Sequence, residues 1–123
     1  MPPIGSAFPL HTDPISSHRQ ITQLFASIQR GRLQYDKAIA EYDKAIQLSP
    51  DDADTYNCRG RAYRSKGDYE MAFADYGKAI QLRPDFALAY YNRGFAYAAR
   101  REFEKAIADY DKSIQLDPGY DRA

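Results

Sequence analysis

The chain has 123 residues, of which 44% are apolar and 28% charged, and its seventeen basic and seventeen acidic side chains cancel. This composition is typical of one globular domain, and a zero net charge gives no long-range attraction for nucleic acid or an anionic membrane, so neither is an expected partner. The lone Cys58 excludes an intrachain disulfide and fits a reducing, cytoplasmic location, and no apolar run reaches the roughly 20 residues that cross a bilayer.

The N-terminal residues predict a flexible tail, which we assign to residues 1–18. Three prolines and a glycine interrupt residues 1–13, which disfavours both helix and strand. Asp13 and Pro14 then form a typical helix start, with a capping residue followed by proline. Apolar tail residues such as Phe8 could dock on another part of the molecule.

Two helices are expected before residue 50. Apolar residues recur at helical spacing at Ile21, Leu24, Phe25 and Ile28, and this pattern ends around Gly31. The next helix covers residues 35–48, and Pro50 stops it.

The rest of the chain predicts two further helix pairs. Helices are expected over residues 53–66 and from the Gly67-Asp68 turn to Leu82, then over 87–100 and 102–116. Together with the N-terminal pair, this gives an all-α chain of six helices in three antiparallel pairs.

Nearly the same letters occur three times, at residues 38–50, 72–84 and 106–118, with an offset of 34 residues each time. A fixed period of this length indicates a repeat array, in which each unit buries its apolar face against its neighbour. Within it, Gly60 and Gly94 lie inside predicted helices, between tyrosines. Because a helical glycine costs about 1 kcal/mol relative to alanine, its recurrence indicates a contact too close for a methyl group.

The recurring residues resemble the tetratricopeptide repeat. They are Tyr56, Gly60, Tyr63, Ala72, Tyr76, Ala79 and Pro84, and then Tyr90, Gly94, Tyr97, Ala106, Tyr110, Ser113 and Pro118. The resemblance implies a right-handed α-solenoid, with a degenerate first repeat at 19–52, complete repeats at 53–86 and 87–120, and a C-terminal stub at 121–123. The first repeat departs from the pattern, since it has Thr22, Ala26 and Gln29 where tyrosine, glycine and tyrosine are expected.

The resemblance further implies a concave groove, lined by the first helices, that binds a peptide or helix of a partner protein. The groove residues that it indicates are Asn57, Arg61, Arg64, Tyr91, Asn92 and Phe95. A basic stretch beside an aromatic one suits a peptide with a carboxylate and a bulky apolar side chain. The alternative is that the arginines are a solvated face and the aromatic residues are packing residues.

Some members of this family grip a C-terminal carboxylate through lysine, asparagine and arginine side chains. The matching positions here are Gln23, Ser27, Cys58, Leu88 and Asn92, and none is basic, so no such clamp is expected. Catalytic, cofactor and metal sites are not expected either, because Cys58 has no histidine nearby and no paired ligand spacing occurs. We predict that the protein is not an enzyme.

Three carboxylates, Glu41, Asp75 and Asp109, occupy one repeat position, and each has a lysine three residues later. The spacing predicts ion pairs on an exposed helix face, worth about 0.2–0.5 kcal/mol apiece.

The last repeat has an uncovered apolar face at Phe103, Ile107, Tyr110 and Ile114, with no further helix after Pro118. Repeat arrays need polar terminal units for solubility. The chain could be a fragment of a longer array, form a homodimer through this end, or cover the face with its tail. The runner-up function is therefore a self-assembling module that stacks through this face.

Overall fold

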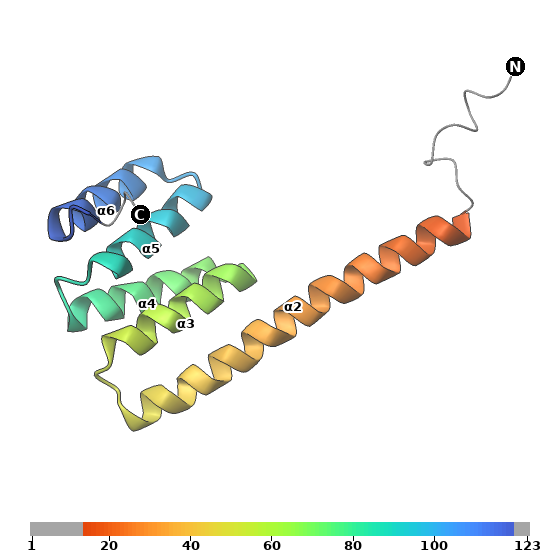
Figure 1. Ribbon diagram of the computed structural model, residues 1–123, viewed down its shortest axis with the longest axis horizontal. Coiled ribbons are helices and arrows are strands. Elements are labelled where there is room, and N and C mark those ends of the chain that lie inside the picture. Colours follow the sequence, from red (N-terminus) through yellow and green to blue (C-terminus); the bar gives the residue numbers. More distant parts are fainter. Residues whose placement is uncertain (1–13, 120–123) are drawn as a thin grey trace, which may run out of the picture. The chain divides into compact units, whose positions relative to one another are not determined.

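The computed structural model describes residues 14–119, which contain five helices and no strand (Figure 1). The helices are α2 (Pro14–Leu48), α3 (Ala53–Lys66), α4 (Tyr69–Leu82), α5 (Ala87–Ala99) and α6 (Phe103–Leu116). The predicted all-α class is confirmed for this part of the chain. The tail over residues 1–13 and the stub at 121–123 lie outside it, whereas residues 14–18, which we assigned to the tail, are helical.

The chain divides into two compact units, residues 1–34 and residues 35–123. Of the first unit the structure describes the N-terminal part of α2, residues 14–34. Its apolar side chains at positions 21, 24, 25 and 28 lie at helical spacing, as predicted, and are each 52–65% exposed. The second unit contains residues 35–48 of α2 and helices α3 to α6.

The break predicted near Gly31 is wrong, because α2 continues through this residue without a turn. In the later repeats the turn contains Gly67 and Arg101, whose φ angles are 97° and 64°. The 34-residue offset places Leu33 at their position. A side chain disfavours this left-handed conformation by about 1–2 kcal/mol, and Gly31, two residues early, is not placed to relieve it.

The polarity of the first repeat gives a second reason for the continuous helix. At the positions where α3 carries Tyr56, Gly60 and Tyr63, the first repeat has Thr22, Ala26 and Gln29. A helix pair of the usual kind would bury two of these polar side chains and leave the apolar stripe outside. Burying polar groups without partners is unfavourable. The packing of such a pair would therefore do little to offset the cost of a left-handed turn at Leu33.

The remaining helix ends follow the predicted signals. Asp52 caps α3, since its carboxylate accepts a hydrogen bond from the Asp54 backbone N–H at 3.0 Å. Gly67 ends α3 in the left-handed conformation that a helix C-terminus favours. Helices α2, α4 and α6 each end two residues before a proline, which cannot continue a helix.

The recurring glycines let paired helices approach closely, as predicted. Helix α3 packs along α4, and α5 along α6 (Figure 1). A Cβ atom at Gly60 would lie 2.7 Å from Tyr76 Cε1 and 3.3 Å from the Ala72 carbonyl oxygen. At Gly94 it would lie 3.0 Å from the Tyr110 ring.

The prediction of three exposed ion pairs is wrong for two of them. Lys44 and Glu41 pair at 3.6 Å on an exposed face, as expected. Asp75, however, is buried and accepts two hydrogen bonds from Arg59, at 2.7 and 2.8 Å. This bonding raises the pKa of the Arg59 guanidinium above its usual value.

The last repeat makes the same buried pair. Arg93 donates two hydrogen bonds to Asp109, at 2.7 and 2.9 Å, and these raise the pKa of Arg93. Each pair joins the first helix of a repeat to its second helix. Spacing within one helix could not predict this contact between two helices.

Helix α5, the first helix of the third repeat, packs on the apolar face of α4, the second helix of the second repeat. Ala96 packs with Ala72 and Tyr76 in one buried cluster, and the Phe73 and Tyr97 rings stack with centroids 4.5 Å apart. A second cluster joins α4 to α5 through Ala79 and Ala89. The contact between α4 and α5 thus combines buried alanines from both helices with one pair of stacked rings.

Candidate functional site

The floor of the predicted groove is a buried pair of amides. Asn57 on α3 and Asn92 on α5 are only 3% and 6% exposed. The Asn92 Nδ2 donates a hydrogen bond to Asn57 Oδ1 at 3.0 Å, which satisfies buried polar groups and joins the two helices. These residues are therefore placed beneath the surface, and any direct partner contact falls to their exposed neighbours.

The neighbours of this amide pair are two arginines on α3, Arg61 and Arg64, and two aromatic residues on α5, Tyr91 and Phe95, and of these Arg61 and Phe95 are exposed. Arg64 lies over the Phe95 ring, with its guanidinium carbon 4.6 Å from the ring centroid. Phe95 remains 47% exposed. Tyr91 is half-buried, and its ring centroid lies 5.5 Å from that of Tyr110 on α6. The structure thus brings Arg64 and Phe95 into contact, whereas Tyr91 packs on α6.

The arginines of this region fall into two groups. In the first group, Arg59 and Arg93 face the second helix of their repeat and pair with its carboxylates. Arg83 and Arg100 also have carboxylate partners, which are Asp54 and Glu70. Arg61 and Arg64 are different, because no carboxylate of the described residues lies within ion-pair distance of either. They leave positive charge on this surface that the described residues do not neutralise.

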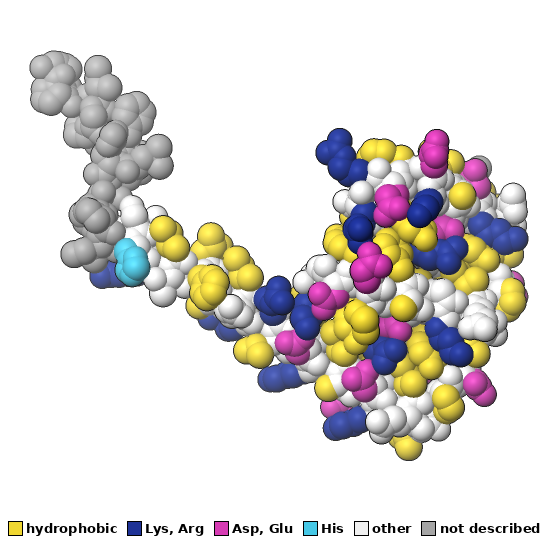
Figure 2. Space-filling view, turned by 180° about the vertical axis from the view of Figure 1, so that it is seen from behind, with side chains coloured by type: hydrophobic (Ala, Val, Ile, Leu, Met, Phe, Trp, Pro, Cys, Tyr) yellow, Lys and Arg dark blue, Asp and Glu magenta, His cyan; other side chains and the backbone are white. Residues whose placement is uncertain are grey.

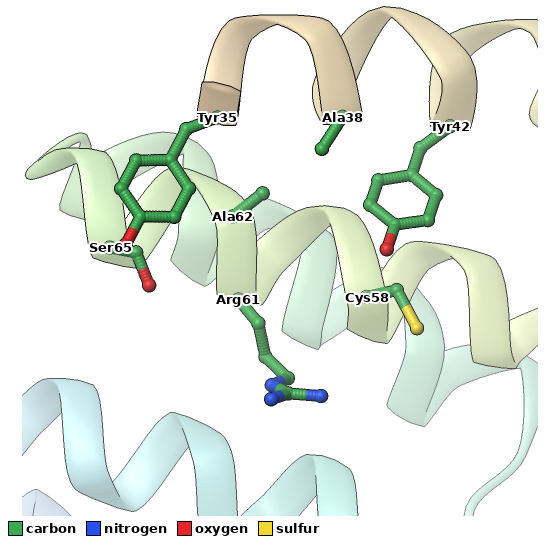
Figure 3. A pocket seen from close by; sticks show the side chains of 7 residues that line it. All are labelled: Tyr35, Ala38, Tyr42, Cys58, Arg61, Ala62 and Ser65. Carbon is green, nitrogen blue, oxygen red and sulfur yellow. The ribbon is translucent and has the colours of Figure 1, made fainter. Parts of the chain in front are cut away.

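A hollow of about 220 Å³ adjoins Arg61, between α2 and α3 (Figure 3). The residues that line it are Tyr35, Ala38, Tyr42, Cys58, Arg61, Ala62 and Ser65. Figure 3 shows the two tyrosine rings on the α2 side and the Arg61 side chain at the opposite edge. The lining is mostly apolar, with one cation.

Tyr42 and Cys58 meet across this hollow. Burial raises the pKa of the Tyr42 hydroxyl, and the neighbouring thiol raises it further. Cys58 is a free, partly exposed thiol. The raised pKa keeps the Tyr42 hydroxyl neutral at pH 7, so this part of the hollow suits an uncharged side chain next to the Arg61 cation.

The hollow was not predicted, although the sequence contains a signal for it. Ala38 and Tyr42 occupy the repeat positions of Ala72 and Tyr76, which α3 covers in the second repeat. A first repeat without a proper first helix therefore predicts that the surface over Ala38 and Tyr42 is left open.

The C-terminal face is exposed, with one exception among the four predicted residues. Phe103, Ile107 and Ile114 are 54%, 58% and 41% exposed. Tyr110 is half-buried, and its ring lies over Gly94 of the preceding helix. It therefore belongs to the contact between α5 and α6, and the open face consists of the other three residues.

The described residues contain no group of three His, Cys, Asp or Glu side chains that could hold a metal ion. None of the helices in residues 14–119 is both long and apolar enough to span a membrane.

The helical repeats and the buried glycine contacts define an α-solenoid of stacked helix pairs. Family models described as "TPR repeat" match residues 29–63 and 60–100, and a model described as "Tetratricopeptide repeat" matches residues 87–120. The chain belongs to the tetratricopeptide repeat family. The comparison with curated proteins gave no match.

Solved structures of the same fold include two of MamA and one of RPAP3. The MamA structures are 28% identical, with TM-scores of 0.66 and 0.63, and the matches cover 73% and 72% of this chain. The chain spans about half the length of these proteins, 53% and 48%. The first TPR of Spaghetti (RPAP3), bound to the HSP90 peptide SRMEEVD, is 31% identical, with a TM-score of 0.66 and 68% of each chain covered.

Proposed function

We propose that this protein is a scaffold that binds a partner peptide or helix on the surface formed by Arg61, Arg64, Tyr91 and Phe95. The observation that carries the proposal is the presence of two arginines without a carboxylate partner, one of which lies over the exposed Phe95 ring. Repeat arrays use extended concave surfaces of this kind for binding. The buried amide pair of Asn57 and Asn92 supports this surface from below.

The chemistry of the surface favours an acidic partner with one bulky apolar side chain. Guanidinium groups form strong, charge-assisted hydrogen bonds to carboxylates, and Arg61 and Arg64 are placed to make them. The hollow beside Arg61 is large enough for an apolar side chain of the partner, and the Tyr35 and Tyr42 rings would pack against it. An aromatic and arginine surface is also typical of binding hot spots.

The RPAP3 structure supports this direction, since the peptide bound to it, SRMEEVD, is acidic. The present chain has no lysine at the positions that grip a terminal carboxylate. We therefore propose that its partner is recognised through internal aspartate or glutamate side chains, independently of a free C-terminus. No group in the proposed surface is arranged for catalysis, and its role is binding alone.

The test is a selection of random 12-residue peptides, displayed on phage, against the full chain. We expect selected peptides to combine Asp or Glu with Leu, Phe or Ile, and to bind equally well as C-terminal amides. Arg64→Glu is expected to weaken binding roughly tenfold, which corresponds to about 1.4 kcal/mol. Lys112→Glu is the matched control, because it makes the same charge change on exposed α6. Selected peptides that are basic, or that bind Arg64→Glu unchanged, would refute the proposal.

A second candidate function is self-assembly through the face formed by Phe103, Ile107 and Ile114. The observation that favours it is that the equivalent residues of the preceding repeat, Tyr69, Phe73 and Ile80, pack against buried clusters. An exposed apolar face of this kind marks a contact surface. The solution mass of the full chain across a concentration series tests this candidate, and a monomer at every concentration would exclude it.

A further inference from the structure

Two apolar faces of this chain lie at repeat positions that contact each other where one repeat meets the next. One is the stripe on residues 14–34 of α2, and the other is the exposed face of α6. Each face belongs to its own unit of the chain. In the 34-residue period, the α6 face corresponds to the side of α4 that contacts α5, and the stripe corresponds to the side of α5 that contacts α4.

The stripe occupies the positions with which a first helix packs against the preceding repeat. The 34-residue period places Ile21 and Ile28 at the positions of Ala89 and Ala96 on α5. Ala89 and Ala96 are fully buried, in clusters with residues of α4. Leu24 and Phe25, at the positions of Asn92 and Arg93, lie between them on the same side of the helix. The stripe thus has the pattern of a helix that packs on a repeat before it.

The α6 face occupies the positions that receive such a helix. Ile107 and Ile114 correspond to Phe73 and Ile80 of α4. Phe73 stacks on Tyr97 of α5, and Ile80 packs on the cluster that contains Ala89. In α6 the same positions are 58% and 41% exposed.

The charges of the two segments are also complementary. Residues 14–34 contain three arginines and no acidic residue. Residues 102–117 contain five carboxylates and two lysines, and one of the carboxylates, Asp109, pairs with Arg93. In Figure 2, yellow and dark blue side chains follow the stretch that adjoins the grey residues. Opposite charges on the two segments of a neutral chain favour a contact between unlike segments.

We propose that residues 14–34 of one copy dock on α6 of a second copy, in the place that the first helix of a fourth repeat would take. The inference rests on the second candidate function and names its partner segment. Such a contact joins two different surfaces, so it is heterologous and continues from copy to copy unless the rotation closes a ring. The expected product is a head-to-tail assembly that grows with concentration.

The decisive experiment mixes two variants that each lack one of the surfaces. Phe25→Glu removes the stripe and keeps α6, whereas Ile107→Glu removes the α6 face and keeps the stripe. Both residues are exposed, so folding should be retained, and far-UV circular dichroism checks this. We expect each variant to be monomeric by sedimentation and a 1:1 mixture to form a dimer that does not grow further. Leu48→Glu, at an apolar site 85% exposed and outside both faces, should assemble as wild type does.

The possible results distinguish head-to-tail docking from self-assembly through α6 of another kind. If Phe25→Glu still assembles while Ile107→Glu does not, two α6 faces pair with each other, which overturns the inference and keeps the second candidate. If Ile107→Glu still assembles alone, stripes pair with stripes, and both are overturned. A wild type that is monomeric throughout also overturns both. Added salt should weaken the head-to-tail assembly, because its charges lie at the surface.

Discussion

Adding a methyl group at Gly60 and at Gly77 should change stability in opposite directions. Both glycines lie inside helices, so either substitution by alanine gains about 1 kcal/mol of helix propensity. At Gly77 no atom lies within 4 Å of the new Cβ, and the gain is retained. At Gly60 the Cβ would lie 2.7 Å from the Tyr76 ring, and this ring is fully buried.

The overlap at Gly60 determines the size of the effect. Overpacking a close contact costs about 1–3 kcal/mol, so Gly60→Ala should lose up to about 2 kcal/mol in total. The two variants should then differ by about 1–3 kcal/mol, which is the overpacking cost itself. Each kcal/mol moves the melting temperature by about 4–8 °C in a domain of this size. Urea unfolding followed by circular dichroism measures both variants. If Gly60→Ala stabilises the protein as much as Gly77→Ala does, the close contact with Tyr76 is not present.

Three further predictions concern the buried polar groups and the hollow. Asp75→Asn should lower the free energy of unfolding by up to about 3 kcal/mol, because it breaks the buried pair and leaves Arg59 with the half-exposed Asp43 alone. Glu41→Gln in the exposed pair should change this free energy by less than about 0.5 kcal/mol. Equal effects in urea unfolding would contradict the assigned burial. Tyr76→Phe should be neutral or stabilising by about 1 kcal/mol, because the buried Tyr76 hydroxyl has no hydrogen-bond partner of good geometry, although the Arg64 cation lies near it. Burial raises the pKa of Tyr76 to about 12. The unfolded chain therefore loses the Tyr76 proton at lower pH than the folded chain does, and the free energy of unfolding should fall as the pH rises from about 10 to 12. If a Tyr76→Phe variant shows the same fall, Tyr76 is not its cause. A maleimide should label the partly exposed Cys58 in the folded protein. A selected peptide that fills the hollow should slow this labelling. If a peptide binds in an Arg64-dependent way but does not slow the labelling of Cys58, it lies outside the hollow.

The sequence predicted the periodic parts of the fold well. The helix bounds of α3 to α6, the Asp52 cap and the close contacts at Gly60 and Gly94 agree with the structure, because each depends on local signals that recur every 34 residues. The first repeat was harder, since Gly31 resembles a turn residue but the turn position itself holds Leu33. Comparing turn positions across the repeats, instead of locating the nearest glycine, would have predicted the continuous helix.

The candidate site was predicted in part. The spacing identified which residues share a helix face, and the structure places Arg64 and Phe95 together as that spacing implies. It could not tell that Asn57 and Asn92 bond to each other, or that Asp75 and Asp109 turn inward to Arg59 and Arg93. Such partners lie on different helices, 16 to 35 residues apart, and periodicity within one helix carries no information about them.

The most direct test of the proposed function is a charge exchange between the protein and a selected peptide, measured by fluorescence anisotropy. The peptide is compared with a version in which each Glu or Asp is replaced by Lys, against the wild type and the Arg61→Glu, Arg64→Glu double variant. If the two arginines recognise carboxylates, the wild type should prefer the acidic peptide, and the double variant should lose it and gain the lysine peptide. If both proteins bind the two peptides alike, the arginines are a solvated face, and the groove does not select its partner by charge.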